Sequence, residues 1–193
     1  MLETTLISAR LSLRPLGHED LEVSHSIWTS AGVRRFLFDD EVMAISRARE
    51  MLATNTRLFA ECGFGLWGAS MHGDSRLIGF GGFWYFREPP ELELVYGVVE
   101  DKWGRGYGTE LAAGVVAHGF HVLGMASIRA STDADNEASH RVLEKLGFRL
   151  IRRGTVGTLD TLFYELRPRE SGAEVTRSQF LNARARPSPP HES

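Results

Sequence analysis

The chain has 193 residues, of which 42% are hydrophobic and 24% charged, and its formal net charge is −3. This length and composition predict one globular domain with a single core, and no apolar run approaches membrane-spanning length. The near-neutral charge gives no reason to expect nucleic-acid binding through a basic surface, and the single cysteine, Cys62, excludes an internal disulfide framework. Because no signal pattern follows Met1, we expect a cytoplasmic protein with neither membrane nor nucleic-acid partners.

The N-terminal third is predicted to hold one strand and two helices. Apolar residues alternate over 6–15, which indicates a strand with one buried face. An amphipathic helix is expected over 21–28, and Gly32 is expected to break it. Residues 33–41 predict an irregular loop, and apolar residues at helical spacing predict a second helix over 45–62.

Strands are predicted for the middle of the chain, where a misleading glycine pattern also occurs. Residues 63–68 (Gly-Phe-Gly-Leu-Trp-Gly) match the Gly-x-Gly-x-x-Gly spacing of dinucleotide-binding loops. That fingerprint needs a strand before it and a helix after it. Here a strand continues to Met71, and Gly73-Asp74 turns the chain into a second strand over 77–86. We therefore disfavour a nicotinamide-dependent oxidoreductase.

A third strand, over 91–99, leads into a glycine-rich stretch over 102–109 (Lys-Trp-Gly-Arg-Gly-Tyr-Gly-Thr). Glycines allow positive φ and leave no Cβ in the way, so the backbone N–H groups of 104–108 can point at one anion. The helix that follows begins with unpaired N–H donors and a positive dipole end, and Arg105 adds a charge. The pattern predicts a phosphate-binding loop, although an ordinary strand-to-helix loop is the alternative on this feature alone.

The helix over 106–122 is apolar on more than one side, which predicts burial against a sheet. His118 and His121 lie three apart on it, and we expect them on the helix surface because no further metal ligands are apparent. A strand over 127–132 and a helix starting at Asn136 follow.

Gly147 occupies the position of a left-handed helix cap. Two last strands are expected over 148–153 and 158–166, with Gly157 in the turn. We divide the chain into a domain over 1–167 and a flexible polar tail over 168–193.

A second motif makes the glycine-rich loop specific. Residues 136–148 read Asn-x-x-Ser followed by Val-Leu-Glu-Lys-x-Gly-Phe. Together with the loop, this motif resembles the GNAT family of acetyl-CoA-dependent N-acetyltransferases, and more narrowly the RimJ/RimL branch of ribosomal-protein N-terminal acetyltransferases. Trp103 stands where the wider family has Gln or Arg, but tryptophan is usual in this branch. The resemblance covers roughly residues 5–166.

The resemblance implies a mixed α/β (α+β) GNAT fold with a central, mostly antiparallel sheet. In that fold the strands starting near Glu91 and Ser127 splay apart, and the thioester arm of the cofactor enters the gap. It also implies transfer of acetyl from acetyl-CoA to a primary amine, on a protein N-terminus or a small molecule, without a metal and in a monomer or homodimer. A non-catalytic acyl-CoA-binding module of the same fold is the alternative.

The cofactor site is expected to combine three parts. The pyrophosphate would lie on Trp103, Gly104, Arg105, Gly106, Tyr107, Gly108 and Thr109. Backbone groups of Gly97, Val98 and Val99 would bind the thioester arm, with a backbone N–H near Val98 polarising the acetyl carbonyl. By resemblance, Asn136 would bond the pantetheine or an ordered water, and a helix N-cap is the alternative role for this residue.

Two proton-transfer groups are expected. Glu93 resembles the strand glutamate of the branch and is the predicted general base, directly or through water. The alternative is a solvent-facing strand carboxylate like its neighbour Glu91. Ser139 is the predicted hydrogen-bond donor to the leaving thiolate, and Tyr96 and Tyr107 compete with it for that role.

Overall fold

A computed structural model describes residues 5–38, 40–87 and 89–168. The predicted tail lies outside the described residues, apart from Pro168 itself. Within the described part, no helix combines the length and apolar character that crossing a bilayer requires.

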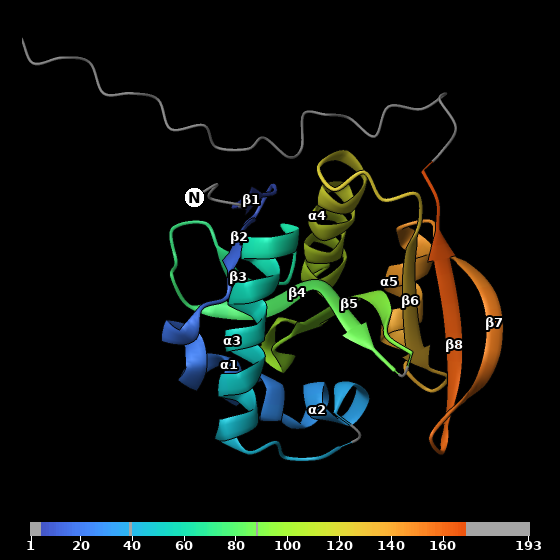
Figure 1. Cartoon of the computed structure of the whole chain (residues 1–193), viewed down its shortest axis with the longest axis horizontal. Coiled ribbons are helices and arrows are strands. Elements are labelled where there is room, and N and C mark those ends of the chain that lie inside the picture. Colours follow the sequence, from blue (N-terminus) through green and yellow to red (C-terminus); the bar gives the residue numbers. More distant parts are fainter. Residues whose placement is uncertain (1–4, 39, 88, 169–193) are drawn as a thin grey trace, which may run out of the picture.

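The described strands form one eight-stranded sheet (Figure 1). Their bounds are Leu6–Ile7 (β1), Leu11–Pro15 (β2), Leu66–Met71 (β3), Leu77–Phe86 (β4), Glu91–Val98 (β5), Ile128–Asp133 (β6), Arg149–Val156 (β7) and Leu159–Leu166 (β8). Their order is β1-β2-β3-β4-β5-β6-β8-β7, and only β5 and β6 are parallel. The predicted mixed fold with a mostly antiparallel sheet is therefore confirmed. The prediction that residues 63–68 lead into a strand and do not form a dinucleotide-binding loop is also confirmed.

Helices cover both faces of the sheet (Figure 1). Their bounds are His18–Asp20 (η1, 3₁₀), Leu21–Thr29 (α1), Ala31–Leu37 (α2), Ile45–Cys62 (α3), Glu100–Lys102 (η2, 3₁₀), Tyr107–His121 (α4) and Glu137–Lys145 (α5). Buried residues of α1, α2 and α3 share one core cluster with Phe80 and Val95. Buried residues of α4 and α5 share the other with Leu94 and Val98. Neighbouring residues of β5 thus face opposite layers, as side-chain alternation in a strand requires.

The sheet splits between β5 and β6. Their single registered pair is Glu93 with Arg129, and beyond it the described strands have no ladder pairs with each other. The Val99 N–H bonds the Ile78 carbonyl of β4, so the N–H and C=O groups of Val98 and Tyr96 point the other way, into the split. The expected gap for a thioester arm is therefore present.

The first predicted strand is wrong as a single element. The chain forms β1 and β2, which pair with each other as a hairpin. The Ser8 hydroxyl accepts the Leu11 N–H, and the Ser8 N–H donates to the Leu11 carbonyl, which closes the turn. Apolar and polar residues continue to alternate through the turn, so the apolar pattern did not reveal that the strand is interrupted.

The loop predicted over 33–41 is also wrong, because α2 occupies most of it. The break falls at Ser30, whose extended backbone separates α1 from α2. Gly32 lies inside α2, where a Cβ would collide with the indole of Trp103. Its lack of a side chain therefore serves a close approach between α2 and the glycine-rich loop.

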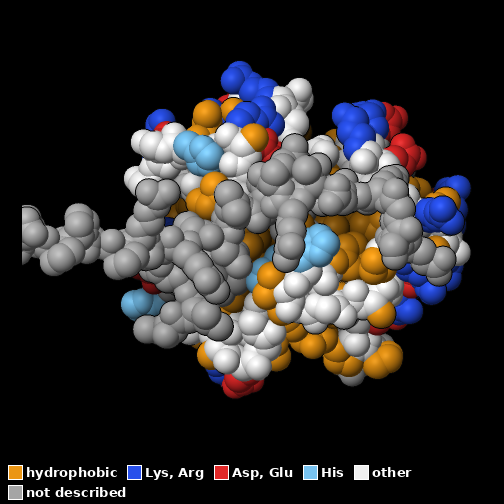
Figure 2. Space-filling model, turned by 90° about the horizontal axis from the view of Figure 1, so that it is seen from above, with side chains coloured by type: hydrophobic (Ala, Val, Ile, Leu, Met, Phe, Trp, Pro, Cys, Tyr) orange, Lys and Arg blue, Asp and Glu red, His pale blue; other side chains and the backbone are white. Residues whose placement is uncertain are grey.

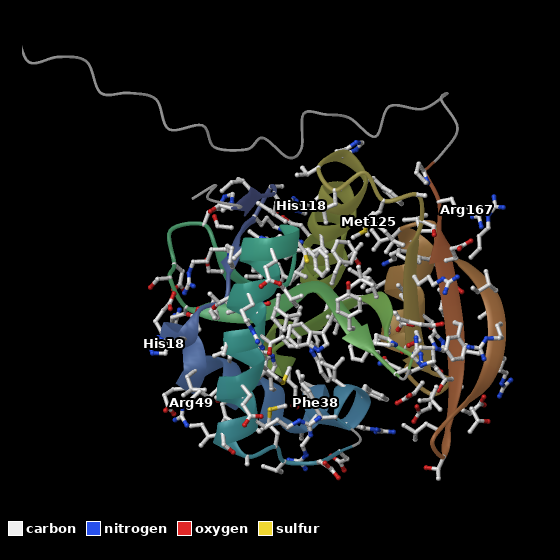
Figure 3. The ribbon with its side chains drawn as sticks, viewed as in Figure 1. His18, Phe38, Arg49, His118, Met125 and Arg167 are labelled. Carbon is white, nitrogen blue, oxygen red and sulfur yellow. The ribbon has the colours of Figure 1, made fainter. Side chains whose placement is uncertain are left out.

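His118 is not the surface histidine that the helical pattern predicted. Its side chain is 4% exposed, lies between α4 and α3 (Figure 3), and its Nε2 is 3.2 Å from the Gly63 carbonyl. Burial lowers the pKa of His118, and the bond to the Gly63 carbonyl opposes this in part. Among the described residues, no group of three or more His, Cys, Asp or Glu side chains could hold a metal.

The last two strands leave a basic edge on the sheet. Seen from above, Lys and Arg side chains gather on the side formed by β7 and β8 (Figure 2). Arg149, Arg152 and Arg153 are exposed on β7, the edge strand. Charges on an edge strand oppose pairing with another sheet, which gives these arginines a structural role.

Candidate active site

A cavity of about 780 Å³ follows the split between β5 and β6. It extends from α2 past β5 to the glycine-rich loop and the first turns of α4 and α5. Most of the predicted site residues line it: Glu93, Val98, Trp103, Gly104, Gly106, Tyr107, Gly108, Thr109, Asn136 and Ser139. Val99 and Arg105 do not line it, because the Val99 N–H bonds the Ile78 carbonyl and the Arg105 side chain is exposed.

The glycine-rich loop has the geometry of an anion cradle. Gly104 and Gly106 have φ of 71° and 79°, which glycine adopts without steric cost. Gly106 is the N-cap of α4, so the N–H groups of the first helical turn are unpaired. A Cβ on Gly108 would come no closer to the protein than 3.8 Å, at Val98 Cγ2, so the side-chain space belongs to the cavity. These features fit the pyrophosphate of coenzyme A.

Trp103 fastens this loop to β5. Its Nε1 donates to the Val98 carbonyl at 2.6 Å, and its side chain is 51% exposed. The Val98 carbonyl at the split is thereby occupied, whereas the Val98 N–H faces the split. Trp103 therefore positions the loop against the strand that would bind the thioester arm.

A polar cluster from the β1–β2 turn supports the loop from outside. Arg10 bonds Glu110 Oε2 through its Nε at 2.6 Å and donates to the Arg105 carbonyl at 3.0 Å. The Ser8 hydroxyl donates to Glu110 Oε1 at 2.7 Å, and the Arg10 guanidinium lies 4.3 Å from the Tyr107 ring centroid. Burial alone would raise the pKa of Glu110, but its bonds to Ser8 and Arg10 outweigh burial and lower it below the ordinary value near 4.5.

Replacing Glu110 with Gln is expected to weaken both folding and acetyl-CoA binding. At neutral pH the variant should lose about 1–3 kcal/mol of unfolding free energy, the worth of hydrogen bonds to a buried charge. The pKa of this carboxyl is lower in the folded protein than in the unfolded chain. Its charged form therefore stabilises the fold at pH values above the unfolded-state pKa, and this stabilisation is lost as the pH falls through the folded-state pKa. The difference from wild type should therefore close below about pH 4.5, as measured by urea unfolding at several pH values.

The matched control is Glu137→Gln, whose exposed i,i+4 pair with Arg141 is 3.1 Å long. It should change stability by less than about 0.5 kcal/mol at any pH. A Glu110 variant with the same small, pH-independent effect would show that the cluster does not support the loop.

Asn136 caps α5, and Ser139 lies against a tyrosine. Asn136 Oδ1 accepts the Ser139 N–H at 3.1 Å. The Tyr96 hydroxyl is 2.8 Å from Ser139 Oγ and donates to the Ser139 carbonyl at 3.2 Å. Burial raises the pKa of Tyr96 to about 12, and the bond to Ser139 opposes this in part. The two competing donors thus form one hydrogen-bonded pair, and Tyr107 lies elsewhere on the cavity wall, beside Arg10.

Glu93 is not the solvent-facing carboxylate of the alternative interpretation. Its residue exposure is 3%, and it forms an ion pair with Arg87. The Ser131 hydroxyl donates to Glu93 Oε2 at 2.6 Å and accepts from Arg87 Nη1 at 3.2 Å. Glu91 is more exposed and shares the Arg87 guanidinium at 2.9 Å. The sequence pattern of the strand did not distinguish the two glutamates, whereas the structure shows that Glu93 is buried and Glu91 is more exposed.

The two proton-transfer candidates lie on opposite faces of the sheet. Glu93 shares the face of Val95, which packs with α1, α2 and α3. Tyr96 packs with the α4 and α5 layer, where it meets Ser139. Because β5 and β6 separate next to Glu93, a group in the split can contact both faces. Chemically, this arrangement offers a carboxylate on one side of a bound thioester and hydroxyl donors on the other.

Sequence reasoning missed Arg87, Ser131, Arg10 and Glu110. Arg87 follows β4 and has a φ of 64°, a region that non-glycine residues rarely occupy. No periodicity or motif marks these residues. Ser131, Arg10 and Glu110 gain their roles from partners far away in the chain, and Arg87 gains its role from the turn that sets it beside Glu91 and Glu93. The positive φ of Arg87 is visible only in the folded backbone.

Comparisons with known proteins show the family of this chain. The family profile described as an acetyltransferase (GNAT) domain matches residues 10–149. An uncharacterized N-acetyltransferase, YoaA, of Bacillus subtilis (strain 168) is 31% identical over 140 residues, which are 72% of this chain and 79% of that protein.

Solved structures share the fold. An acetyltransferase from Agrobacterium tumefaciens (strain C58) has a TM-score of 0.74 at 22% identity, over 85% of this chain and 94% of that one. RimL, a ribosomal L7/L12 α-N-protein acetyltransferase solved in complex with coenzyme A, has a TM-score of 0.69 at 16% identity. The alignment covers 83% of this chain and 96% of the RimL chain.

Proposed function

The chain belongs to the GNAT family of acetyltransferases and is an acetyl-CoA-dependent acyltransferase; from this premise, we propose that it acetylates a primary amine with Glu93 as general base. The observation that carries the proposal is the cavity along the split, which joins the anion cradle, Glu93 and the Tyr96–Ser139 pair. We further propose that it acts as a RimJ/RimL-like enzyme. The motif at 136–148 and the likeness in fold to RimL support this assignment.

In this mechanism the cradle holds the pyrophosphate, and the Val98 N–H binds the acetyl carbonyl oxygen as negative charge develops on it. Bound acetyl-CoA supplies a thioester, whose carbonyl carbon bonds the amine nitrogen while the carbon–sulfur bond breaks. Glu93 accepts the proton that the amine loses, directly or through a water. An α-amino group has a pKa of roughly 7.7–8.0, so only mild basicity is required.

The Tyr96–Ser139 pair stabilises the departing thiolate by hydrogen bonding. A thiol has a pKa of about 8.5, so the thiolate needs a donor more than a strong acid. Asn136 orders the Ser139 backbone and keeps its own amide N–H groups available to the cavity. Holding both reactants in one cavity supplies much of the rate.

The test is release of coenzyme A thiol from acetyl-CoA in the presence of a panel of primary amines and peptides. Acetyl transfer predicts amine-dependent release and an acetylated product by mass spectrometry. Acetyl-CoA binding by calorimetry, with no turnover of any amine, would instead favour the non-catalytic acyl-CoA-binding module.

Replacing Tyr96 with Phe is expected to lower kcat about tenfold, the worth of one hydrogen bond to a charged group. Ser139→Ala should have a similar or greater effect, because it removes the hydroxyl that we place at the sulfur. With a pKa of about 12, Tyr96 stays protonated throughout the assay range, so the pH–rate profile between about pH 6 and 10 should keep its shape in Tyr96→Phe.

The matched control is Tyr164→Phe, which changes a buried tyrosine of β8 that does not line the cavity. Its kcat should equal that of wild type. A profile that loses its alkaline limb in Tyr96→Phe would show instead that Tyr96 titrates as the acid.

A further inference from the structure

A second cavity, of about 380 Å³, adjoins the first. Its described lining includes six aromatic residues, Trp28, Phe38, Phe80, Trp84, Tyr85 and Phe86, of which Tyr85 turns its ring to Phe64 in the other layer. We call it the ring pocket. Its volume falls within the usual range for small-molecule sites, roughly 300–1,000 Å³.

The ring pocket adjoins the active-site cavity next to Glu93. Leu37, Phe86, Arg87 and Val95 line both cavities. Trp84 on β4 stands directly opposite Glu93 on β5. Directly opposed residues project to the same face with Cβ atoms about 4.5–5.5 Å apart, so the Trp84 side chain begins next to the proposed base.

The ring pocket also lies on the same face of the sheet as Glu93. Its residues Trp28, Leu66, Phe80 and Val95 belong to the core cluster of α1, α2 and α3. The anion cradle and the Tyr96–Ser139 pair lie with α4 and α5. A molecule that enters from the ring pocket therefore reaches the split from the face opposite the thiolate donors.

The charges of the described lining do not match one class of acceptor. Among the lining residues that the structure describes, Glu41 is the only acidic one, and it is exposed, whereas Arg47 and Arg87 are both cationic. Aminoglycosides and polyamines carry several ammonium groups and need several carboxylates. The described lining instead offers the partly exposed aromatic side chains of Trp84 and Phe86 and the exposed guanidinium of Arg47, while Arg87 is already paired with Glu91 and Glu93.

We infer that the acceptor is an arylalkylamine: a primary amine joined through a short carbon spacer to an aromatic ring that fills the ring pocket. This inference rests on the proposed acetyl transfer, and it narrows the acceptor. The ring packs against Trp84 while the nitrogen lies near Glu93, so a spacer of one or two carbons spans the gap between neighbouring strand positions. A free arylalkylamine and the aromatic N-terminal residue of a peptide share this chemistry.

The experiment compares kcat/KM for six acceptors with the full chain and saturating acetyl-CoA. Tryptamine and phenylalaninamide test the free amine, and the tripeptides Phe-Ala-Ala and Ala-Ala-Ala test the peptide source. Propylamine lacks a ring, and spermidine is the polycation. Burying one aromatic ring is worth about 1.5–3 kcal/mol, so we expect the aromatic acceptors to exceed their matched partners at least about tenfold.

A variant series locates this preference in the ring pocket. In Trp84→Ala the ratio of kcat/KM for tryptamine to that for propylamine should fall at least about tenfold, and Trp84→Phe should restore most of it. The control Leu150→Ala, on exposed β7 and outside both cavities, should leave the ratio unchanged. Acetyl-CoA affinity by calorimetry reports that each variant is folded.

The possible outcomes separate this inference from the acetyl transfer on which it rests. Turnover of spermidine or propylamine as fast as tryptamine would overturn the inference and leave amine acetylation standing. An aromatic preference that survives Trp84→Ala would also overturn it. Acetyl-CoA binding without turnover of any of the six amines would overturn both.

Discussion

Replacing Glu93 with Gln is expected to lower kcat by about 10²–10⁴-fold, the usual contribution of a positioned general base. The amide keeps the size of the side chain and still accepts the hydrogen bond from Ser131, which is 2.6 Å long in the wild type. It cannot take a proton from the amine. Steady-state kinetics at saturating acetyl-CoA measure the effect, and calorimetry should show unchanged affinity for acetyl-CoA.

The dependence on pH distinguishes a base from a structural carboxylate. An amine with a pKa near roughly 7.7–8.0 is already neutral at higher pH, so the deficit of Glu93→Gln should shrink as pH rises through that value. A deficit that is constant with pH, or that appears as weaker acetyl-CoA binding, would show that Glu93 only holds Arg87 in place.

The matched control is Glu91→Gln. Glu91 lies two residues away, shares the Arg87 guanidinium at 2.9 Å and does not line the cavity. Its replacement should leave kcat within about twofold of wild type, because a partly exposed ion pair contributes little. Equal losses in both variants would assign the effect to Arg87 and not to proton transfer.

Replacing Gly108 with Ala is expected to separate folding from cofactor binding. Gly108 lies in the first turn of α4, and a Cβ there would meet no protein atom closer than 3.8 Å. Alanine favours a helix over glycine by up to about 1 kcal/mol, so the melting temperature should stay equal or rise. The methyl group would stand in the cradle, where it displaces a phosphate oxygen from the N–H groups.

Loss of one such charge-assisted hydrogen bond is worth about 1.5–3 kcal/mol, so the Kd for acetyl-CoA should rise roughly 10–150-fold. The control Gly73→Ala should behave in the opposite way. Gly73 has a φ of 77° in a turn away from the cavity, so alanine there should cost stability and leave affinity unchanged. Unchanged affinity in Gly108→Ala would place the pyrophosphate elsewhere.

The sequence by itself determined the local parts of this protein. The strand over Leu77–Phe86 and the helix over Ile45–Cys62 were predicted with the bounds that the structure has. The left-handed glycines of the cradle and of Gly147 were also predicted. Residue periodicity, the φ freedom of glycine and helix capping act over a few neighbouring residues, so a single sequence records them.

Only the tertiary structure decided which chemical groups meet. Tyr96 and Ser139 are 43 residues apart, Ser131 and Glu93 are 38 apart, and Arg10 and Glu110 are 100 apart. Each pair depends on sheet order, since β6 lies beside β5 and β8 inserts between β6 and β7. The burial of His118 and the helix α2 likewise follow from what packs against them. Such contacts depend on packing between residues far apart in the chain. Local periodicity does not encode this packing, and the packing overrides weak local preferences for helix or strand.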